Sequence, residues 1–266
     1  MFTQEVRFRL FGCYYATMTV LNEIVEYTDN LLQVSQYKDY CPNGLQIEGS
    51  DKVNKIISGV TASQALLDAA VAAGADLVLV HHGYFWKGEK PVITGMRKRR
   101  INTLLGNDIS LLAYHLPLDA HSEYGNNAGL AEKLGLQVTG TLNPEGIGQV
   151  GKLDKSTSSD EFVAHIEHVL GREPTLISGG DRPVQRVAWC TGAAQSYFEQ
   201  AIEKGVDAYI SGEISEQTVH LARESGVHYI AAGHHATERY GVQLLGEHLA
   251  EKFGLKHQFI DIDNPI

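Results

Sequence analysis

Short apolar runs alternate along the chain with segments of helical length. The run at residues 55–60 precedes a segment expected to form a helix ending on Gly74, and a second apolar run occupies residues 77–80. Runs of this length that are apolar on both faces are typical of buried parallel strands, with the intervening helix as the crossover. The pattern therefore predicts α/β units in which helices cover a mainly parallel or mixed sheet.

This order of elements occurs twice. The first apolar run leads into Thr61 and a helix ending on Gly74, and the run at 186–190 leads into Thr191 and a helix ending on Gly205. Threonine is a favourable helix N-cap, and glycine readily adopts the left-handed conformation that ends a helix. We therefore expect the two segments to be copies of one strand–helix–strand unit.

A second correspondence extends the repeat. The block LAEKLGL at 130–136 recurs as LAEKFGL at 249–255. Such near identity makes a single doubly wound domain with chance similarity the weaker alternative. We predict an α/β protein of two similar three-layer α/β/α domains that are related by internal duplication.

The pattern also suggests where the domains begin and end. Helical spacing of apolar residues becomes clear only from about residue 18, so residues 1–17 are predicted to be an N-terminal extension. The Gly-rich, polar stretch at 142–159 is the expected join between the halves. The predicted division is a first α/β domain at 18–140 and a second at 141–266.

The composition excludes several classes of protein. The 266 residues are 43% hydrophobic, which is enough for a sizeable core. The 22 Lys and Arg against 32 Asp and Glu give a formal charge of −10, which disfavours nucleic-acid binding. Cys13, Cys41 and Cys190 are scattered without a CxxC motif, so neither a disulfide framework nor a thiolate zinc site is predicted. No apolar run approaches about 18 residues, so we expect a cytoplasmic protein that does not span a membrane.

Candidate chemistry gathers where the predicted strands end. Open α/β sheets bind ligands beyond the carboxyl ends of their strands. An isolated histidine is more often a core or surface residue, but five of the twelve histidines here follow predicted strands. The polar residues at these strand ends are His81, His82, His115, Asp119, Glu213, His234, His235 and Glu238.

The repeat pairs some of these residues. The two LAEK blocks begin 119 residues apart (249 − 130), and the same offset places His115 on His234 and Asp119 on Glu238. Each half thus offers an imidazole and, four residues later, a carboxylate. Two related halves that face each other would bring both pairs into one cleft.

The donor set predicts a metal site. Imidazole and carboxylate without thiolate suit Zn, Mn, Fe or Ni. The side chains of His81 and His82 diverge from a regular strand, so we expect them to reach two neighbouring ions. A bridging carboxylate, Asp119 or Glu238, would link ions about 3.5–4 Å apart, as in two-metal hydrolases. We therefore predict two divalent metal ions per chain in the cleft between the domains.

Several motifs at these positions resemble a known family. NGLQ at 43–46, VHHG at 80–83, HLPLD at 115–119 and GHHATE at 233–238 are similar to motifs of the NGG-one-interacting-factor-three-like family. Its bacterial members are often named GTP cyclohydrolase I type 2 homologues. The resemblance extends from about residue 18 to the end of the sequence. It implies a dinuclear metal centre between two α/β domains and a homohexamer.

The resemblance also implies roles for individual residues. His115 would be a further ligand or would orient one, and Glu213 would be a general base or an orienting group. The metal ligands that the family motifs imply are His81, His82, Asp119, His234 and Glu238.

Two functions follow from this reasoning. The first is a metal-dependent hydrolase that acts on a nucleotide or a related small phosphorylated molecule, by analogy with the ring opening of GTP. Lys87 or the basic cluster at 97–100 would then hold phosphates. The alternative is a non-catalytic metal-binding protein that serves in interaction, regulation or metal delivery. Turnover of nucleotides by the metal-loaded protein would favour the first function, and tight metal retention without turnover the second.

Overall fold

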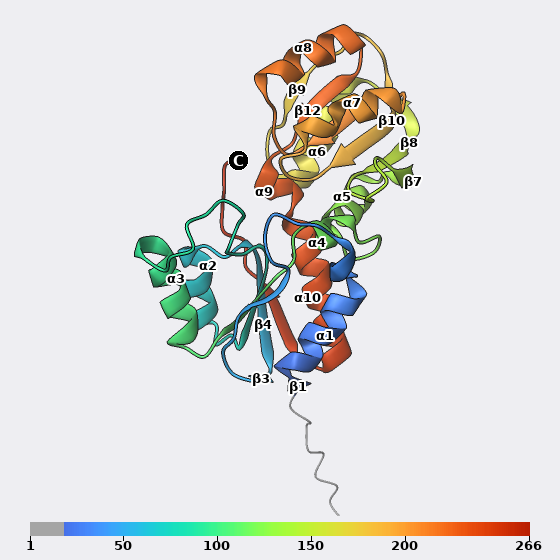
Figure 1. The fold of residues 1–266 in the computed structure, drawn as a ribbon. Helices are drawn as coiled ribbons and strands as arrows, with labels where there is room; N and C mark the ends of the chain where they lie inside the picture. Colours follow the sequence, from blue (N-terminus) through green and yellow to red (C-terminus); the bar gives the residue numbers. More distant parts are fainter. Residues whose placement is uncertain (1–18) are drawn as a thin grey trace, which may run out of the picture.

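The computed structural model describes residues 19–266, so the extension predicted for residues 1–17 lies outside the described residues. Two mixed sheets, each with helices on both faces, form two units of the molecule (Figure 1). The predicted α/β class with two three-layer units is confirmed. Within the described residues, no helix is long and apolar enough to cross a membrane.

The first sheet has the strand order β13-β4-β5-β6-β2. Neighbours among the first four strands are parallel, whereas β2 is antiparallel to β6. The strands are β2 (Gly44–Ile47), β4 (Lys55–Thr61), β5 (Leu77–His82), β6 (Ser110–Ala113) and β13 (Lys256–Phe259).

Helices bury both faces of this sheet. Ile57 and Val78 pack with α2 and α3, while their neighbours Ile56 and Leu77 pack with α1 and α10, because successive strand residues point to opposite faces. The helices are α1 (Leu21–Leu31), α2 (Gln64–Ala72), α3 (Gly95–Leu105) and α10 (Arg239–Phe253). A small ribbon of β1 (Thr19–Val20) and β3 (Lys52–Val53), and the 3-10 helix η1 (Val34–Gln36), complete this part.

The second sheet has the order β7-β8-β10-β11-β12-β9, with β10, β11 and β12 parallel and the other pairs antiparallel. Its strands are β7 (Gln137–Thr141), β8 (Gln149–Thr157), β9 (Thr175–Ile177), β10 (Val184–Cys190), β11 (Ala208–Ser211) and β12 (His228–Ala231). The stretch 142–159, predicted as a join, therefore contains the whole of the long inner strand β8 of this sheet.

Helices also cover both faces of the second sheet. Val187 packs with α5 and α6, and its neighbour Ala188 packs with α7 and α8. The helices are α5 (Asn126–Leu134), α6 (Ser159–Leu170), α7 (Phe198–Glu203) and α8 (Glu216–Ser225). Short helical turns lie near the junction of the two units: α4 (Leu116–Ala120), α9 (His234–Thr237) and the 3-10 helix η2 (Gln195–Tyr197).

The two sheets share local details that support duplication. The Asp76 carboxylate accepts hydrogen bonds from the backbone N–H groups of Asn54 and Lys55, at 2.8 and 3.0 Å. Asp207 accepts from Gln185 and Arg186 in the same way, at 3.1 and 2.8 Å. Equivalent aspartates thus anchor the start of equivalent strands. The predicted threonine N-caps are wrong, because Ser63 caps α2, whereas Thr61 and Thr191 point elsewhere.

The two helices that contain the LAEK blocks, α5 and α10, each pack on the sheet of the other half. Helix α5 follows β6 of the first sheet but packs on the second, and α10 follows β12 of the second sheet but packs on the first (Figure 1). Strand β13 then pairs with β4, and β7 pairs with β8. The sheets therefore do not divide the chain at residue 140, where we predicted a boundary. The helices cross in close contact, since a Cβ at Gly129 would lie 2.5 Å from Cβ of Tyr240.

Candidate metal centre

The strand ends of both units meet at the junction. His81 and His82 are the last residues of β5, and His115 directly follows the first sheet's β6 and precedes α4. His234 begins α9, and Glu238 is its C-terminal boundary residue. All five residues, together with Asp119 in α4, lie in one cluster, as the pairing of the two halves predicted.

Glu238 lies at the centre of the cluster and is 2% exposed. Its Oε2 is 3.2 Å from Nε2 of His82 and 3.0 Å from Nε2 of His234. Its Oε1 is 3.5 Å from Nε2 of His81. One carboxylate thus contacts imidazoles from both halves of the chain. Space for it exists because residue 192 is glycine, where a Cβ would lie 2.0 Å from Glu238 Oε1.

Asp119 completes one side of the cluster. Its Oδ1 lies 3.5 Å from Nε2 of His81 and accepts hydrogen bonds from Nδ2 of Asn126 and Oγ1 of Thr191, at 2.9 and 3.2 Å. Asp119 is 6% exposed and His81 is completely buried. The orientation of this carboxylate is therefore set by side chains from α5 and from the end of β10.

Each imidazole is held through Nδ1, so Nε2 faces the cluster. The partner of His81 is a backbone carbonyl, which only accepts, so Nδ1 carries a proton and Nε2 is the nitrogen that faces the cluster. Carboxylates play the same part for two other histidines. The Nδ1 partners are the Tyr114 carbonyl for His81 at 2.8 Å, the Thr61 hydroxyl for His82 at 3.1 Å, Asp39 for His115 at 2.7 Å and Glu213 for His234 at 2.7 Å.

The unpaired atoms fit a metal ion. His81 Nε2 and Glu238 Oε2 are buried and have no hydrogen-bond partner. Buried polar atoms are rarely left unpaired, and metal-ligating histidines typically give their other nitrogen to a carboxylate or carbonyl. Ligand atoms within 4.8 Å of one another occur in the sets His82–His234–Glu238 and His81–Asp119–Glu238. The buried histidine and carboxylate groups could therefore hold a metal.

The charges of the cluster are strongly coupled. Burial opposes protonation of His81, but the Asp119 and Glu238 carboxylates outweigh it and raise the pKa of His81 to about 9. For His234, burial is likewise outweighed by Glu238 and Glu213, and its pKa rises to about 9. Burial lowers the pKa of His82 to about 3. Without metal, protons on two imidazoles thus offset the carboxylates, a role that a divalent cation can fill.

The predicted catalytic candidates occupy different places. His115 lines the cleft and forms a close set with His81 and His82. Glu213 contacts His234 and is 34% exposed in its side chain. The sequence reasoning missed Asp39, whose carboxylate also accepts from Asn43 and from the backbone of Leu116. Burial raises the pKa of Asp39, but these bonds and His115 together lower it to about 2.

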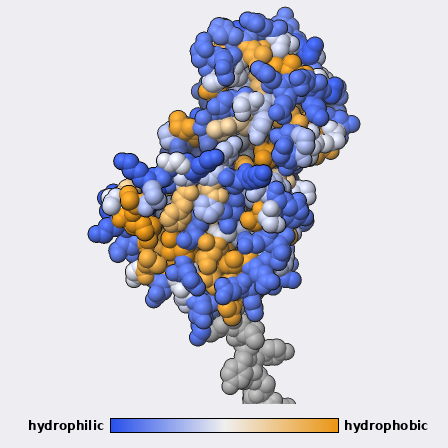
Figure 2. All heavy atoms as spheres, in the orientation of Figure 1, coloured by the Kyte–Doolittle hydropathy of each residue, from blue (hydrophilic) through white to orange (hydrophobic). Residues whose placement is uncertain are grey.

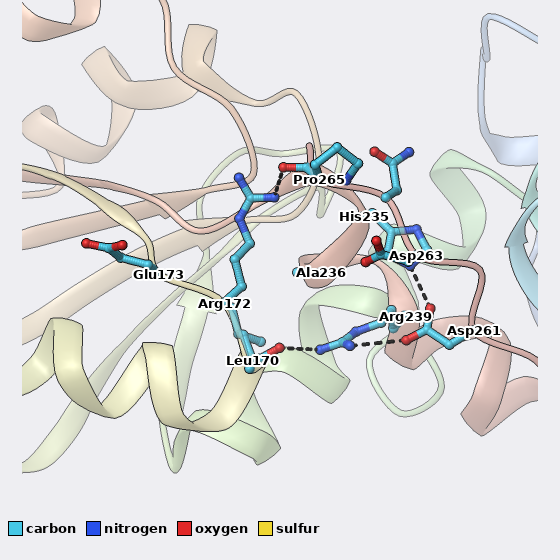
Figure 3. A pocket seen from close by; sticks show the side chains of 11 residues that line it. Leu170, Arg172, Glu173, His235, Ala236, Arg239, Asp261, Asp263 and Pro265 are labelled. Atoms are coloured by element: carbon cyan, nitrogen blue, oxygen red, sulfur yellow. Dashed lines mark hydrogen bonds and ion pairs between the residues drawn. The ribbon is translucent and has the colours of Figure 1, made fainter.

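A strap made by residues 260–266 holds the segment that contains His234 and Glu238 (Figure 3). The two carboxylate oxygens of Asp261 contact Nε2 of His235 at 2.7 Å and the guanidinium of Arg239 at 3.2 Å. These are the residues that directly follow His234 and Glu238 in sequence. The strap also accepts a hydrogen bond from the Arg172 side chain at the Pro265 carbonyl. His235, expected to be no ligand, makes contact here and not in the cluster.

A duplicated α/β protein with a buried histidine–carboxylate centre between its sheets is the class that the fold and the site define. The chain belongs to the Duf34/NIF3 (NGG1p interacting factor 3) family, whose model matches residues 19–265. This confirms the resemblance of the motifs.

Curated relatives share most of this chain. A Pseudomonas aeruginosa protein named GTP cyclohydrolase 1 type 2 homolog is 59% identical over 92% of this chain and 98% of its own length. The Escherichia coli K12 protein of that name is 54% identical over 91% of this chain and 98% of its own. These relatives cover the two units described here.

Solved structures share the fold. A structural-genomics protein called ybgI, described as of unknown function, has a TM-score of 0.90 and 53% identity, covering 93% of this chain and all of its own. TTHA1606 from Thermus thermophilus has a TM-score of 0.85 and 34% identity, with 93% of this chain covered and 100% of that protein.

Proposed function

We propose that this protein is a metal-dependent hydrolase that acts on a nucleotide or a related small phosphorylated molecule, and that His81, His82, Asp119, His234 and Glu238 would hold two divalent ions. The observation that supports the proposal is that two three-residue ligand sets share only Glu238. One set adds His82 and His234, and the other adds His81 and Asp119. The two oxygens of Glu238 approach different imidazoles, as a bridging carboxylate requires.

The chain's own groups would divide the remaining work. Two ions in such a site supply an activated water nucleophile near neutral pH and stabilise developing negative charge. His115, whose Nδ1 is held by Asp39, lines the cleft and would move a proton to or from the substrate. Glu213 would keep the His234 ring in the orientation that presents Nε2. The relatives are named as homologues of a GTP cyclohydrolase, so ring opening of GTP is the candidate reaction.

A non-catalytic role in metal binding or delivery is the second candidate. It is favoured by the burial of His81, Asp119 and Glu238, which are 0%, 6% and 2% exposed. An ion held by these three residues alone would have little open space for a substrate. The metal could be Zn, Mn, Fe or Ni, because imidazole and carboxylate donors accept each of them.

One experiment separates the two functions. The protein is loaded with each candidate metal, its metal content is measured by elemental analysis, and it is incubated with GTP and a panel of nucleotides. Formate release or a changed absorbance spectrum supports the hydrolase. Two retained ions per chain without turnover of any nucleotide would overturn it in favour of metal binding or delivery.

The homohexamer stays a prediction from the family resemblance, and the cytoplasmic location stays a prediction from the sequence. Apolar surface lies over the unit of the first sheet (Figure 2). Exposed apolar side chains of this unit include Val92, Ile93 and Met96, which are 51%, 55% and 56% exposed. A surface of this kind supports contact with another copy. Light scattering after size-exclusion chromatography measures the mass, and a monomer would contradict the prediction.

A further inference from the structure

The cavity beside the metal centre has an aromatic and apolar wall. Its volume is 410 Å³, and on one side it contains ligand candidates such as His82 and His234. The remaining lining is mostly uncharged. It comprises Tyr40, Trp86, Leu116, Ile147, Cys190, Thr191, Ala193, Ala194, Ser196 and Tyr197.

Trp86 is an aromatic residue of this wall that lies beside the cluster. Its indole ring lies 5.0 Å from the ring of His115 and 5.9 Å from that of His82, measured between centroids. The indole Nε1 donates to the carbonyl of Gly83 at 3.2 Å, which fixes the ring. Trp86 belongs to the long connection from β5 to α3, where the second unit has only residues 212–215 between β11 and α8. The first unit's extra segment therefore supplies an aromatic surface beside the cluster.

The cavity lining, as far as the structure describes the chain, contains no lysine or arginine side chain that could bind phosphates. Arg97, from the basic cluster that we expected to hold phosphates, instead contacts the Glu89 carboxylate and the Lys90 carbonyl. Lys87 is exposed and outside the lining.

Carboxylates next to the imidazoles would offset part of the charge of any bound cations. These carboxylates are Asp39, Asp119, Glu213 and Glu238. The whole chain has a formal charge of −10, which repels a polyanion further.

We propose that the cleft selects an uncharged, flat nitrogen heterocycle, such as a nucleobase or nucleoside, through its aromatic wall, and that a polyphosphate tail adds nothing to binding. Stacking on aromatic side chains tolerates many heterocycles, because every base presents a π face. This inference rests on the proposed function, because the heterocycle would lie beside the metal ions that the proposed function requires. It narrows the substrate class from phosphorylated molecules to the ring itself.

Calorimetric titration of the metal-loaded protein with guanosine, GMP, GTP and inorganic triphosphate tests the inference. Guanosine and GTP should bind with affinities within about threefold of each other, and inorganic triphosphate should not compete. GTP binding about tenfold or more tighter than guanosine, equivalent to about 1.4 kcal/mol, would overturn the inference. So would the absence of guanosine binding to protein that turns over GTP. Guanosine binding without any turnover would support this inference and contradict the proposed hydrolase activity.

Two variants at one position test the wall itself. Trp86→Ala should weaken guanosine binding by about tenfold or more, because the stacking surface is lost. Trp86→Phe keeps an aromatic ring and should bind within about threefold of the unchanged protein. Both variants should retain the same metal content, since Trp86 has no donor atom directed at the cluster. Equal affinity of the alanine and phenylalanine variants for guanosine would contradict the role of the ring.

Discussion

Each half of the chain places an equivalent histidine and acid in the cluster, but the two acids contact different numbers of imidazoles. His115 and His234 each have Nδ1 bound to a carboxylate, Asp39 in one half and Glu213 in the other. The acids four residues later differ, because Asp119 lies near one imidazole whereas Glu238 lies near three. The two acids follow matching strand ends, and the one with the longer side chain, Glu238, contacts imidazoles of both halves.

Removing the shared carboxylate should have the largest effect. We expect Glu238→Gln to lose at least one of two metal ions per chain, because both ligand sets contain Glu238. Asp119→Asn, at the equivalent position, should lose at most one ion. Elemental analysis of both variants measures the difference. Equal metal content in the Gln variant and the unchanged protein would refute the bridging role.

Crowding the shared carboxylate should have the next largest effect. Gly192 has φ of 68°, and a Cβ there would overlap Glu238 Oε1. Gly205 has the same φ with only the end of Arg186 nearby, at 3.5 Å, which makes Gly205→Ala a matched control. Both alanine variants should lose about 1–2 kcal/mol to backbone strain. Only Gly192→Ala should also lose metal, as measured by denaturation and elemental analysis; the same metal content in both would contradict the packing argument.

Replacing the carboxylates that orient the histidines should have a smaller effect on metal binding. Glu213→Gln should lower metal affinity by about 10–100-fold, because the group that holds His234 is weakened. Asp39→Asn should lower metal affinity and also thermal stability, since Asp39 accepts further bonds from Asn43 and the Leu116 backbone. Chelator competition measures affinity, and calorimetry measures the melting temperature. Similar melting temperatures for both variants would break this distinction between the halves.

The strap should have the smallest effect. Asp261→Asn weakens the contacts with His235 and Arg239 while leaving every ligand in place. We expect metal affinity to fall by less than for Glu213→Gln, because the strap acts on backbone position and not on a ring nitrogen. Metal dissociation measured with a chromogenic chelator checks this. A loss as large as that of Glu238→Gln would show that Asp261 does more than position the segment.

Much of the fold and of the candidate site could be predicted from local patterns. Apolar runs marked the strands, and His115 and His234 could be paired because polar residues that follow such strands must lie at a sheet edge. The LAEK repeat indicated duplication, and equivalent aspartates at residues 76 and 207 agree with it in the structure. These features are encoded in short stretches of sequence, so they can be recognised without knowledge of the tertiary structure.

The tertiary structure alone decided which sheet each repeated helix covers. Helices α5 and α10 share the LAEK block, and its apolar residues specify that one face is buried without specifying the partner. The same limit applies to Asp39 and Asp261, which come from segments without periodicity. Long-range folding alone brings Asp39 to His115 and Asp261 to His235. By itself the sequence determined the strand ends and their donors, because these depend on neighbouring residues. The exchange of helices, the central position of Glu238 and the aromatic wall depend on contacts between distant segments, which only the packed chain defines.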